Sequence, residues 1–328
     1  MTHFMERNLF AMNLNKNTNS YKAIDLFAGI GGIRLGFEKA FGNEIEFVFA
    51  SEIDKYACET YYANFGEKPC GDITKIDENN IPPFDILLAG FPCQAFSVAG
   101  LRRGFEDTRG TLFFEIARIL KYHKPGIVFL ENVKGFKNHD KGTTFKVVEE
   151  TLESLGYRVF SQVLNAKDFG VPQNRERIYI VGFLDHDVAF EFPKKKELDV
   201  SIKNCLEKKV DEKYYYTNKA LFEKLKDSVV CQDTIYQWRR RYVRANKSMV
   251  CPTLTANMGT GGHNVPLVLD DTSIRKLTPR ECLNFQGFSS NFKLPNIVDS
   301  QLYKQAGNSV SVPVVEKIAH MIKSLIKG

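Results

Sequence analysis

Short runs of hydrophobic residues alternate along the first half of the chain with longer stretches in which hydrophobic residues recur every three or four positions. The short runs predict buried strands, at residues 23–27, 47–50, 85–89, 127–130, 158–164 and 177–183. The longer stretches predict helices, the first ending at residue 41 and the others at 54–63, 111–122 and 143–155. Strands that alternate with helices are typical of βαβ units. We therefore predict an α/β fold, a doubly wound and mostly parallel sheet with helices on both faces.

This alternation ends near residue 185, and a polar stretch with little periodicity follows. A loop with Gly259, Gly261 and Gly262 comes later, and residues 310–326 again have the pattern of an amphipathic helix. We therefore predict a flexible tail at 1–20, a main domain formed by 21–185 plus 302–328, and a second, smaller and irregular domain at 186–301. We expect the last helix to return to the main domain.

The composition is that of a soluble globular protein. The 328 residues are 43% hydrophobic and 26% charged, which suits about two domains. We find neither a signal peptide nor an apolar run of the roughly 18–20 residues that a membrane helix needs. Seven cysteines without a CxxC spacing argue against a disulfide framework and against a cysteine-rich metal site. We expect a cytoplasmic protein in a reducing compartment.

Basic residues are concentrated in the predicted second domain. The net charge is +6, and residues 191–270 hold fifteen Lys or Arg against ten Asp or Glu. Within this window, residues 234–269 include five basic residues, no acidic residue, and the aromatic residues Tyr236, Trp238 and Tyr242. Such a segment suits a polyanion such as nucleic acid, although a merely solvated basic face is the alternative.

A glycine-rich turn follows the first predicted strand, in the sequence Phe27-Ala28-Gly29-Ile30-Gly31-Gly32. Glycines between a strand and a helix allow a ligand to approach the backbone and the helix N-terminus. Glu52, at the end of the second strand, could bind a ribose diol, and Asp72 could accept a hydrogen bond from an adenine amino group. The spacing is not GxGxxG, so a purely structural turn remains the alternative to a nucleotide-like cofactor site.

Further chemically capable residues follow later strands. Cys93 stands on a loop after a buried strand, where a thiol favoured as thiolate could act as a nucleophile, although a structural cysteine is the alternative. Glu131 follows the next strand and could protonate a ring nitrogen if burial raises its pKa. Arg175 and Arg177 are two positions apart and point to the same face of a strand, which suits phosphate or substrate binding.

Six motifs, in this order, carry a resemblance to a known family: FAGIGG, GFPCQAFS, RGTLFF, ENV, QNRERIY and QAGNSV. Together they resemble the DNA (cytosine-5) methyltransferases, and their spacing is similar to that of the compact bacterial members from restriction–modification systems. The resemblance covers about residues 24–183 and 275–322. It implies a Rossmann-like, S-adenosylmethionine-dependent methyltransferase fold, in which the second domain recognises the target sequence.

The resemblance implies S-adenosylmethionine as cofactor, S-adenosylhomocysteine as product, and no metal. The residues that would line the cofactor site are Phe27, Gly29, Ile30, Gly32, Glu52, Ile53, Asp72, Ile73, Pro92, Leu112, Asn308 and Val310. It also implies a catalytic set in which Cys93 adds to C6 of cytosine and Glu131 holds or protonates N3. Arg177 would support the base, with Arg175 beside it.

The same resemblance implies double-stranded DNA as the substrate, with the target cytosine flipped out of the helix. The residues that would contact DNA are Gln94, Ser97, Arg109, Arg239, Arg240, Arg241, Thr253, Gly261 and Gly262. We further expect a monomer. Its expected partner is a cognate restriction endonuclease that acts on the same site without forming a stable complex.

Three alternatives compete with this interpretation. A tRNA cytosine-5 methyltransferase shares the catalytic motifs, but about 90 residues between 185 and 275 and the motif spacing favour DNA. A DNA-binding protein without catalysis is disfavoured by the intact Cys93, Glu131 and Arg177. A nicotinamide-dependent dehydrogenase is disfavoured by the glycine spacing.

Overall fold

The computed structural model describes residues 20–92, 112–246, 248–260 and 263–327. The larger part of the molecule contains a six-stranded sheet in the order β2-β1-β3-β4-β6-β5. Its strands are β1 (Tyr21–Leu26), β2 (Ile45–Ser51), β3 (Ile86–Gly90), β4 (Ile127–Val133), β5 (Arg158–Asn165) and β6 (Glu176–Phe183). Strands β2, β1, β3 and β4 pair in parallel, whereas β6 is antiparallel to both neighbours. The prediction of a mostly parallel sheet is confirmed.

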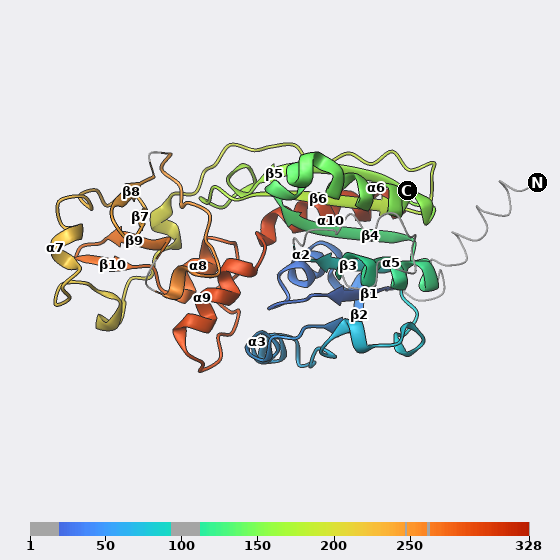
Figure 1. The fold of residues 1–328 in the computed structure, drawn as a ribbon, viewed down its shortest axis with the longest axis horizontal. Helices are drawn as coiled ribbons and strands as arrows, with labels where there is room; N and C mark the ends of the chain where they lie inside the picture. Colours follow the sequence, from blue (N-terminus) through green and yellow to red (C-terminus); the bar gives the residue numbers. More distant parts are fainter. Residues whose placement is uncertain (1–19, 93–111, 247, 261–262, 328) are drawn as a thin grey trace, which may run out of the picture.

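Helices cover both faces of this sheet, as Figure 1 shows. The helices of the larger part are α2 (Gly32–Phe41), α3 (Lys55–Phe65), α5 (Leu112–His123), α6 (Thr143–Ser154) and α10 (Val312–Lys327). Short 3-10 turns join them: η1 (Gly42–Glu44), η2 (Ile73–Lys75), η3 (Glu78–Asn80), η4 (Lys134–Gly142) and η5 (Ala166–Phe169). The C-terminal helix α10 returns to pack beside α2, as predicted.

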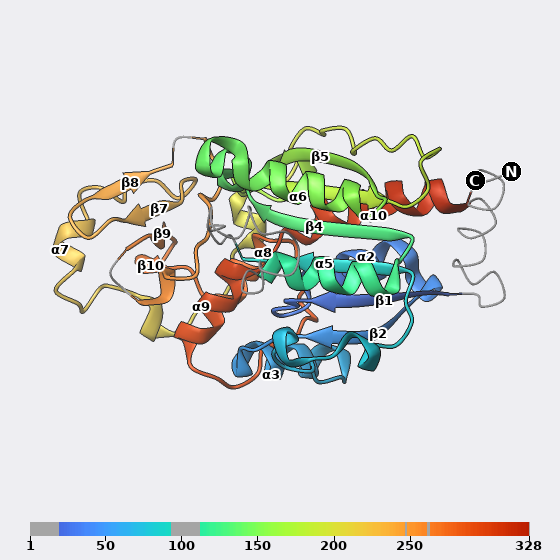
Figure 2. The same cartoon turned by 45° about the vertical axis from the view of Figure 1, so that its right-hand side comes forward.

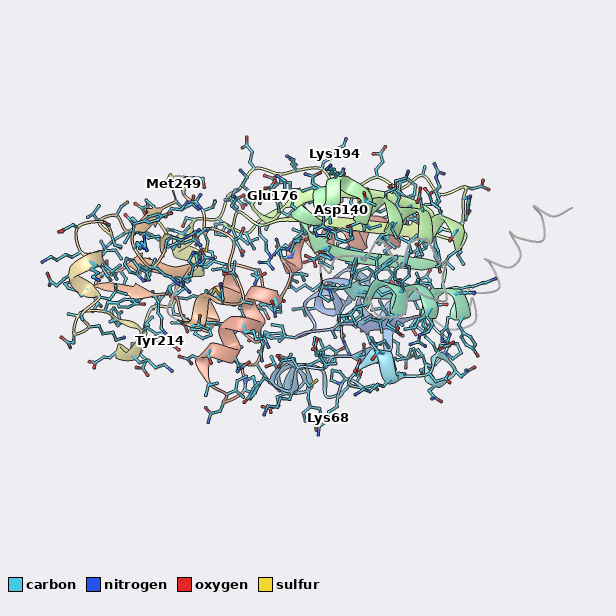
Figure 3. All side chains as sticks on the ribbon, in the orientation of Figure 1. Lys68, Asp140, Glu176, Lys194, Tyr214 and Met249 are labelled. Atoms are coloured by element: carbon cyan, nitrogen blue, oxygen red, sulfur yellow. The ribbon has the colours of Figure 1, made fainter. Side chains whose placement is uncertain are left out.

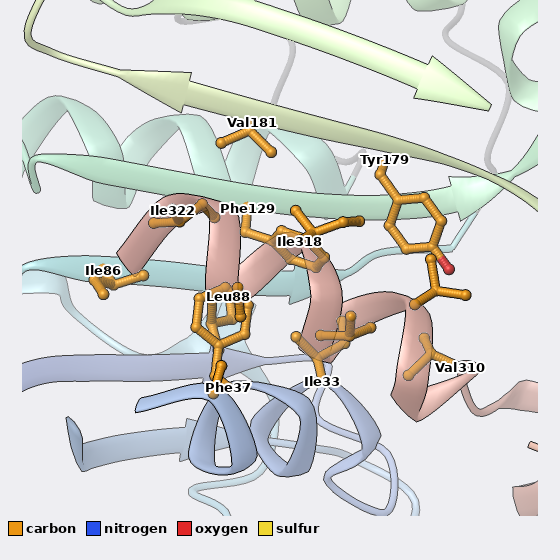
Figure 4. Packing of buried hydrophobic residues seen from close by; sticks show 14 of the residues in the cluster. Ile33, Phe37, Ile86, Leu88, Phe129, Tyr179, Val181, Val310, Ile318 and Ile322 are labelled. Carbon is orange, nitrogen blue, oxygen red and sulfur yellow. The ribbon is translucent and has the colours of Figure 1, made fainter. Parts of the chain in front are cut away.

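The core follows from the alternation of side chains along buried strands. Leu88 of β3 and Phe129 of β4 face α2 and α10, where they contact the cluster that contains Phe37 and Ile318 (Figure 4). Their sequence neighbours point to the opposite face and pack under α5 and α6. Because both faces are covered, the central strands are hydrophobic almost throughout, which is why they could be recognised in the sequence.

The smaller part contains a second, antiparallel sheet that the hydrophobic pattern does not predict. Its strands, in the order β10-β9-β7-β8, are β7 (Tyr236–Trp238), β8 (Val243–Ala245), β9 (Val265–Leu269) and β10 (Ile274–Lys276). The helices here are α7 (Phe222–Leu225), α8 (Pro279–Asn284) and α9 (Asp299–Asn308), with 3-10 turns η6 (Ile202–Cys205), η7 (Glu212–Tyr214) and η8 (Met258–Thr260). Strands this short carry too few residues for a period of two to be visible.

The two parts meet along the segment that precedes β6 and along α8 and α9, which lie between the two sheets in Figures 1 and 2. Gln173 forms a β-bridge with Cys251, and its side-chain amide donates to the carbonyl of Phe285 at 2.9 Å. Phe190 follows β6, the last strand of the larger sheet, and still packs in the core of that sheet. The exact limits of the domains, and the role of residues 1–20, stay predictions, since 1–19 lie outside the described residues.

Membrane-spanning helices and metal-binding clusters are both absent from the described ranges. No helix there is long and apolar enough to cross a membrane. In the same part of the chain, no group of three or more His, Cys, Asp or Glu side chains is placed to hold a metal ion.

Candidate functional site

A cavity of about 670 Å³ lies where the parallel strands end. One wall comes from residues at or just after the carboxyl ends of β1, β2, β3 and β4, and the other from residues 254–256 and 304–310. The chain passes from β1 to β2 on one side and later to β3 on the other, so the cavity lies at the point where the strand order reverses. Open α/β sheets bind their ligands at this point.

The glycine-rich turn forms the floor of this cavity. Gly31 caps α2 with a φ of 81°, a left-handed conformation that favours glycine. A Cβ on Gly32 would lie 2.7 Å from Ser309 Oγ, so the turn packs directly against the segment after α9. A Cβ on Gly29, in contrast, would meet no atom within 4 Å, which leaves open space in front of that backbone.

Glu52 holds the glycine-rich turn in place. Its Oε2 accepts a hydrogen bond from the backbone N–H of Gly29 at 2.8 Å. Its Oε1 accepts from the N–H groups of Ile53 and Asp54, each at 2.8 Å. Glu52 therefore has a structural role that the sequence did not reveal, in addition to lining the cavity.

Most of the predicted cofactor residues do line the cavity. They are Phe27, Gly29, Ile30, Gly32, Glu52, Ile53, Pro92, Leu112, Asn308 and Val310. Asp72 and Ile73 are not among its lining residues. Asp72 caps η2, where its carboxylate accepts from Thr74, and Ile73 is buried in the hydrophobic core. The cofactor contacts predicted for these two residues stay predictions.

Glu131 and Arg177 face each other at the other end of the cavity. Arg177 Nε lies 3.1 Å from Glu131 Oε1, and both side chains are nearly buried. The two residues lie on the neighbouring strands β4 and β6. We expected Glu131 to follow its strand, but it lies within β4. Burial raises the pKa of Glu131 above its ordinary value, an effect opposed by the charges of Arg177 and Arg175. This carboxyl group is therefore suited to hold a proton.

Arg175 also lines the cavity, but its guanidinium is used to hold the backbone. It donates to the carbonyl oxygens of Leu254 at 2.9 Å, Gly307 at 3.0 Å and Ser309. Burial, together with the nearby charge of Arg177, lowers its pKa to about 9. Arg175 thus joins the segment that precedes β6 to both segments of the opposite wall, which makes positioning its clearest role.

The start of the predicted nucleophile loop is attached to β4. Asn132 donates from its side-chain amide to the carbonyl of Phe91 at 2.9 Å, and Pro92 lines the cavity. Cys93 comes next in the chain and lies outside the described residues. The predicted DNA contacts Gln94, Ser97 and Arg109 lie outside them too, as do Gly261 and Gly262.

The described DNA-contact candidates lie on the smaller part. Arg240 and Arg241 are exposed in the turn between β7 and β8. Arg239 and Thr253 line a second, polar cavity of about 230 Å³. We expected the basic segment that includes Trp238 to face a duplex, but Trp238 is buried with Tyr236 in the hydrophobic core of this sheet, so its side chain does not. Met249, labelled in Figure 3, is 66% exposed on the same part of the molecule.

Several cavity residues were not predicted from the sequence. The main ones are Asp54, Thr255, Lys304, Gln305 and Gly307. Asp54 could have been recognised as a helix N-cap, because Asp before a helical stretch is a known signal and its Oδ1 indeed accepts from two backbone N–H groups of α3. Gln305 and Gly307 belong to the QAGNSV motif, which also holds the predicted Asn308 and Val310, so that motif was the signal for them. Thr255 and Lys304 carry no comparable signal, and only the fold brings them to this cavity.

The cavity suits S-adenosylmethionine. Its volume lies within the roughly 300–1,000 Å³ that is usual for cofactor sites. Open space lies in front of Gly29, a carboxylate lies at the end of β2, and apolar side chains line the walls between them. The fold and the cavity together define a Rossmann-like α/β enzyme with a nucleotide-like cofactor.

Comparisons with known proteins narrow this class. The family model described as C-5 cytosine-specific DNA methylase matches residues 21–324. The Type II methyltransferase M.Bsp6I of Bacillus sp. (strain RFL6) is 55% identical over 311 residues, 92% of this chain and 98% of that protein. The Type II methyltransferase M.HhaI of Haemophilus parahaemolyticus is 42% identical over 330 residues, 94% of this chain and 96% of that protein.

Solved structures share the fold. The Entamoeba histolytica methyltransferase EhMeth matches with a TM-score of 0.72 at 22% identity, covering 94% of this chain and 99% of that one. The chain belongs to the C-5 cytosine-specific DNA methylase family. It is therefore an S-adenosylmethionine-dependent DNA cytosine-5 methyltransferase, and the dehydrogenase and non-catalytic alternatives are wrong.

Proposed function

We propose that this enzyme methylates cytosine at C5 within a specific duplex sequence, as the modification enzyme of a restriction–modification system. One observation carries the proposal. The glycine-rich turn with Glu52 and the Glu131–Arg177 pair open into one cavity, so a cofactor and a base would be held side by side. Bound S-adenosylmethionine supplies the methyl group.

The chemistry begins with activation of the base. C5 of cytosine is a poor nucleophile, so a thiolate from Cys93 adds to C6 and forms a C–S bond. The electron pair of the C5–C6 double bond then becomes available at C5, which would take the methyl group as the methyl–sulfur bond breaks and its electron pair stays on the sulfur of the leaving S-adenosylhomocysteine. Transfer of the C5 proton to a base such as water re-forms the double bond and breaks the C6–S bond, so that Cys93 is regenerated as a thiolate.

The described side chains stabilise this addition. Glu131 holds a proton at N3, so negative charge does not build up on the ring, and its raised pKa supports this role. Arg177 orients the Glu131 carboxylate through their ion pair. With Arg175 also buried nearby, the site carries two cationic side chains for one carboxylate, which favours both a thiolate and an electron-rich ring.

The base reaches this cavity only if it leaves the duplex. A cytosine stacked in DNA is out of reach, so we propose that it is flipped out, at a cost of a few kcal/mol. Gln94 is the candidate to fill the vacated space, with Ser97 and Arg109 at the backbone. Arg239, Arg240, Arg241 and Thr253, with Gly261 and Gly262, would contact the duplex, where phosphate contacts position and base contacts specify.

The partners and setting are proposed on the same basis. We propose that the enzyme acts as a cytoplasmic monomer. A restriction endonuclease would act on the same DNA sequence without forming a stable complex with it.

Bisulfite sequencing of genomic DNA from a host that expresses this chain tests the proposal. Protected cytosines should cluster at one position of one short sequence, and expression of Cys93→Ser at equal levels should give none. DNA that remains unprotected when the wild-type chain is soluble and folded would contradict the proposed function.

A further inference from the structure

The two walls of the cofactor cavity are joined by an ion pair. Asp54 caps α3, its Oδ1 accepting from the backbone N–H groups of Tyr56 at 3.0 Å and Ala57 at 3.1 Å. Its Oδ2 is left for Lys304 on α9, whose Nζ lies 2.6 Å away. One carboxylate therefore caps one wall and binds the other.

This pair lies at the rim of the cavity. Both side chains line it, and both are partly open to solvent, with 24% of Asp54 and 47% of Lys304 exposed. Asp54 comes two residues after Glu52, and Lys304 is one helical turn before Asn308. The pair thus connects the strand end that carries Glu52 with the helix that carries Asn308, across the opening between them.

Other contacts, one buried and the others exposed, join α3 to α9 and to the segment that precedes α9 without the ion pair. Thr60 Oγ1 donates to Gln305 Oε1 at 2.9 Å in a buried position. Near the end of α3, the side-chain amide of Asn64 donates to the carbonyl of Lys293 at 2.9 Å and accepts from its N–H at 2.7 Å. The rim pair can therefore open while these contacts keep the walls in place.

We propose that Asp54 and Lys304 form a clasp that must open when cofactor enters and product leaves, so that both are positioning residues that set the residence time of the ligand. The inference rests on the proposed use of S-adenosylmethionine in this cavity. Exposed ion pairs are weak, so breaking the clasp should accelerate release by roughly twofold to fivefold.

Release of S-adenosylhomocysteine from the full chain, followed by stopped-flow fluorescence without DNA, tests the clasp. Lys304→Met keeps most of the side-chain stem, and Asp54→Asn keeps a residue that caps helices equally well. Each should release product faster than wild type, and the double variant should be no faster than the single ones. High salt should accelerate release from wild type toward the rate of the variants and leave the variants unchanged.

A second exposed ion pair, which involves the first residue of α9, provides a matched control. Lys213 pairs with Asp299 at the start of α9 at 3.1 Å, with 54% and 27% of the side chains exposed, and neither residue lines the cavity. Lys213→Met should leave the release rate unchanged.

Other outcomes overturn the inference in distinguishable ways. Unchanged release in both clasp variants would refute it while leaving the proposed function intact. If Asp54→Asn binds S-adenosylhomocysteine more tightly and Lys304→Met binds it more weakly than wild type, Lys304 binds the carboxylate of this ligand instead of closing the cavity. A folded wild-type chain that binds neither S-adenosylmethionine nor its product would refute the proposed function itself.

Discussion

Gly307 lies where the opposite wall of the cavity is most tightly packed, and a methyl group there should damage the site. A Cβ at Gly307 would lie 2.2 Å from Ala256 N and from the carbonyl carbon of Thr255, and 2.5 Å from the Thr255 oxygen. These are backbone atoms, which cannot swing aside as a side chain can. Either α9 or the loop at 254–257 must therefore move by about 1 Å to restore an ordinary contact.

The cost follows from this displacement. Overpacking of this kind destabilises a protein by about 1–3 kcal/mol, offset by up to about 1 kcal/mol because alanine favours a helix more than glycine does. We expect Gly307→Ala to lower the free energy of unfolding by about 1–2 kcal/mol. Because Gly307 and Asn308 both line the cavity, the affinity for S-adenosylmethionine should fall by roughly tenfold or more.

Urea unfolding and titration calorimetry of the folded variant measure the two effects separately. Gly135→Ala is the matched control, since a Cβ there would meet no atom within 4 Å. Its stability should be unchanged or raised by about 0.4–1 kcal/mol, and its cofactor affinity should equal that of wild type. If Gly307→Ala behaves like Gly135→Ala in both assays, the close packing of α9 on this loop is refuted.

Three further predictions concern single features of the molecule. Glu52→Ala should weaken S-adenosylmethionine binding about tenfold to a hundredfold, because roughly 1.5–3 kcal/mol of charge-assisted hydrogen bonding is removed; unchanged affinity by calorimetry would remove Glu52 from the site. Asp25 is buried with both carboxylate oxygens unpartnered, and burial raises its pKa to about 8, so stability should fall as pH rises from about 4 to about 8. In Asp25→Asn the melting temperature should depend less on pH over this range than in wild type. If the melting temperatures of variant and wild type fall equally with pH, the prediction is contradicted. Replacing Arg239, Arg240 and Arg241 with Ala should weaken DNA binding and reduce the log–log salt slope by about 0.9 for each phosphate that is no longer neutralised; an unaltered slope would mean a solvated face only.

The central strands and the helices around them could be predicted because the hydrophobic pattern of each element lies within its own residues. A strand covered on both faces, such as β4, contains a continuous hydrophobic run, here residues 127–130, and α10 shows its buried face in its own periodicity. The four strands of the smaller sheet could not be predicted, since three to five residues carry too little pattern and their pairing is set by contacts distant in the chain.

The same distinction applies to the site. Glu131 and the glycine-rich turn were found because residues at the carboxyl ends of parallel strands converge by geometry. Arg177 reaches the same edge of the sheet because β6 is antiparallel to β4 and starts there. The position of Asp72 depends on the path of a loop, so the capping of η2 by its side chain could not be predicted from the sequence. Nothing local distinguishes Arg175 from Arg177, although one holds three carbonyl groups and the other pairs with Glu131.

The covalent step on cytosine is the central claim, and a duplex containing 5-fluorocytosine at the target position tests it most directly. Fluorine cannot leave C5 as a cation, so elimination is blocked after methyl transfer and the enzyme should remain attached to DNA through denaturing electrophoresis. The adduct should require S-adenosylmethionine and should be absent in Cys93→Ser, because a serine hydroxyl is far less ionised than a thiol. Single Ser variants of the six other cysteines should still form it. A stable adduct in Cys93→Ser, or its absence in a folded Cys58→Ser or Cys282→Ser variant, would contradict the account.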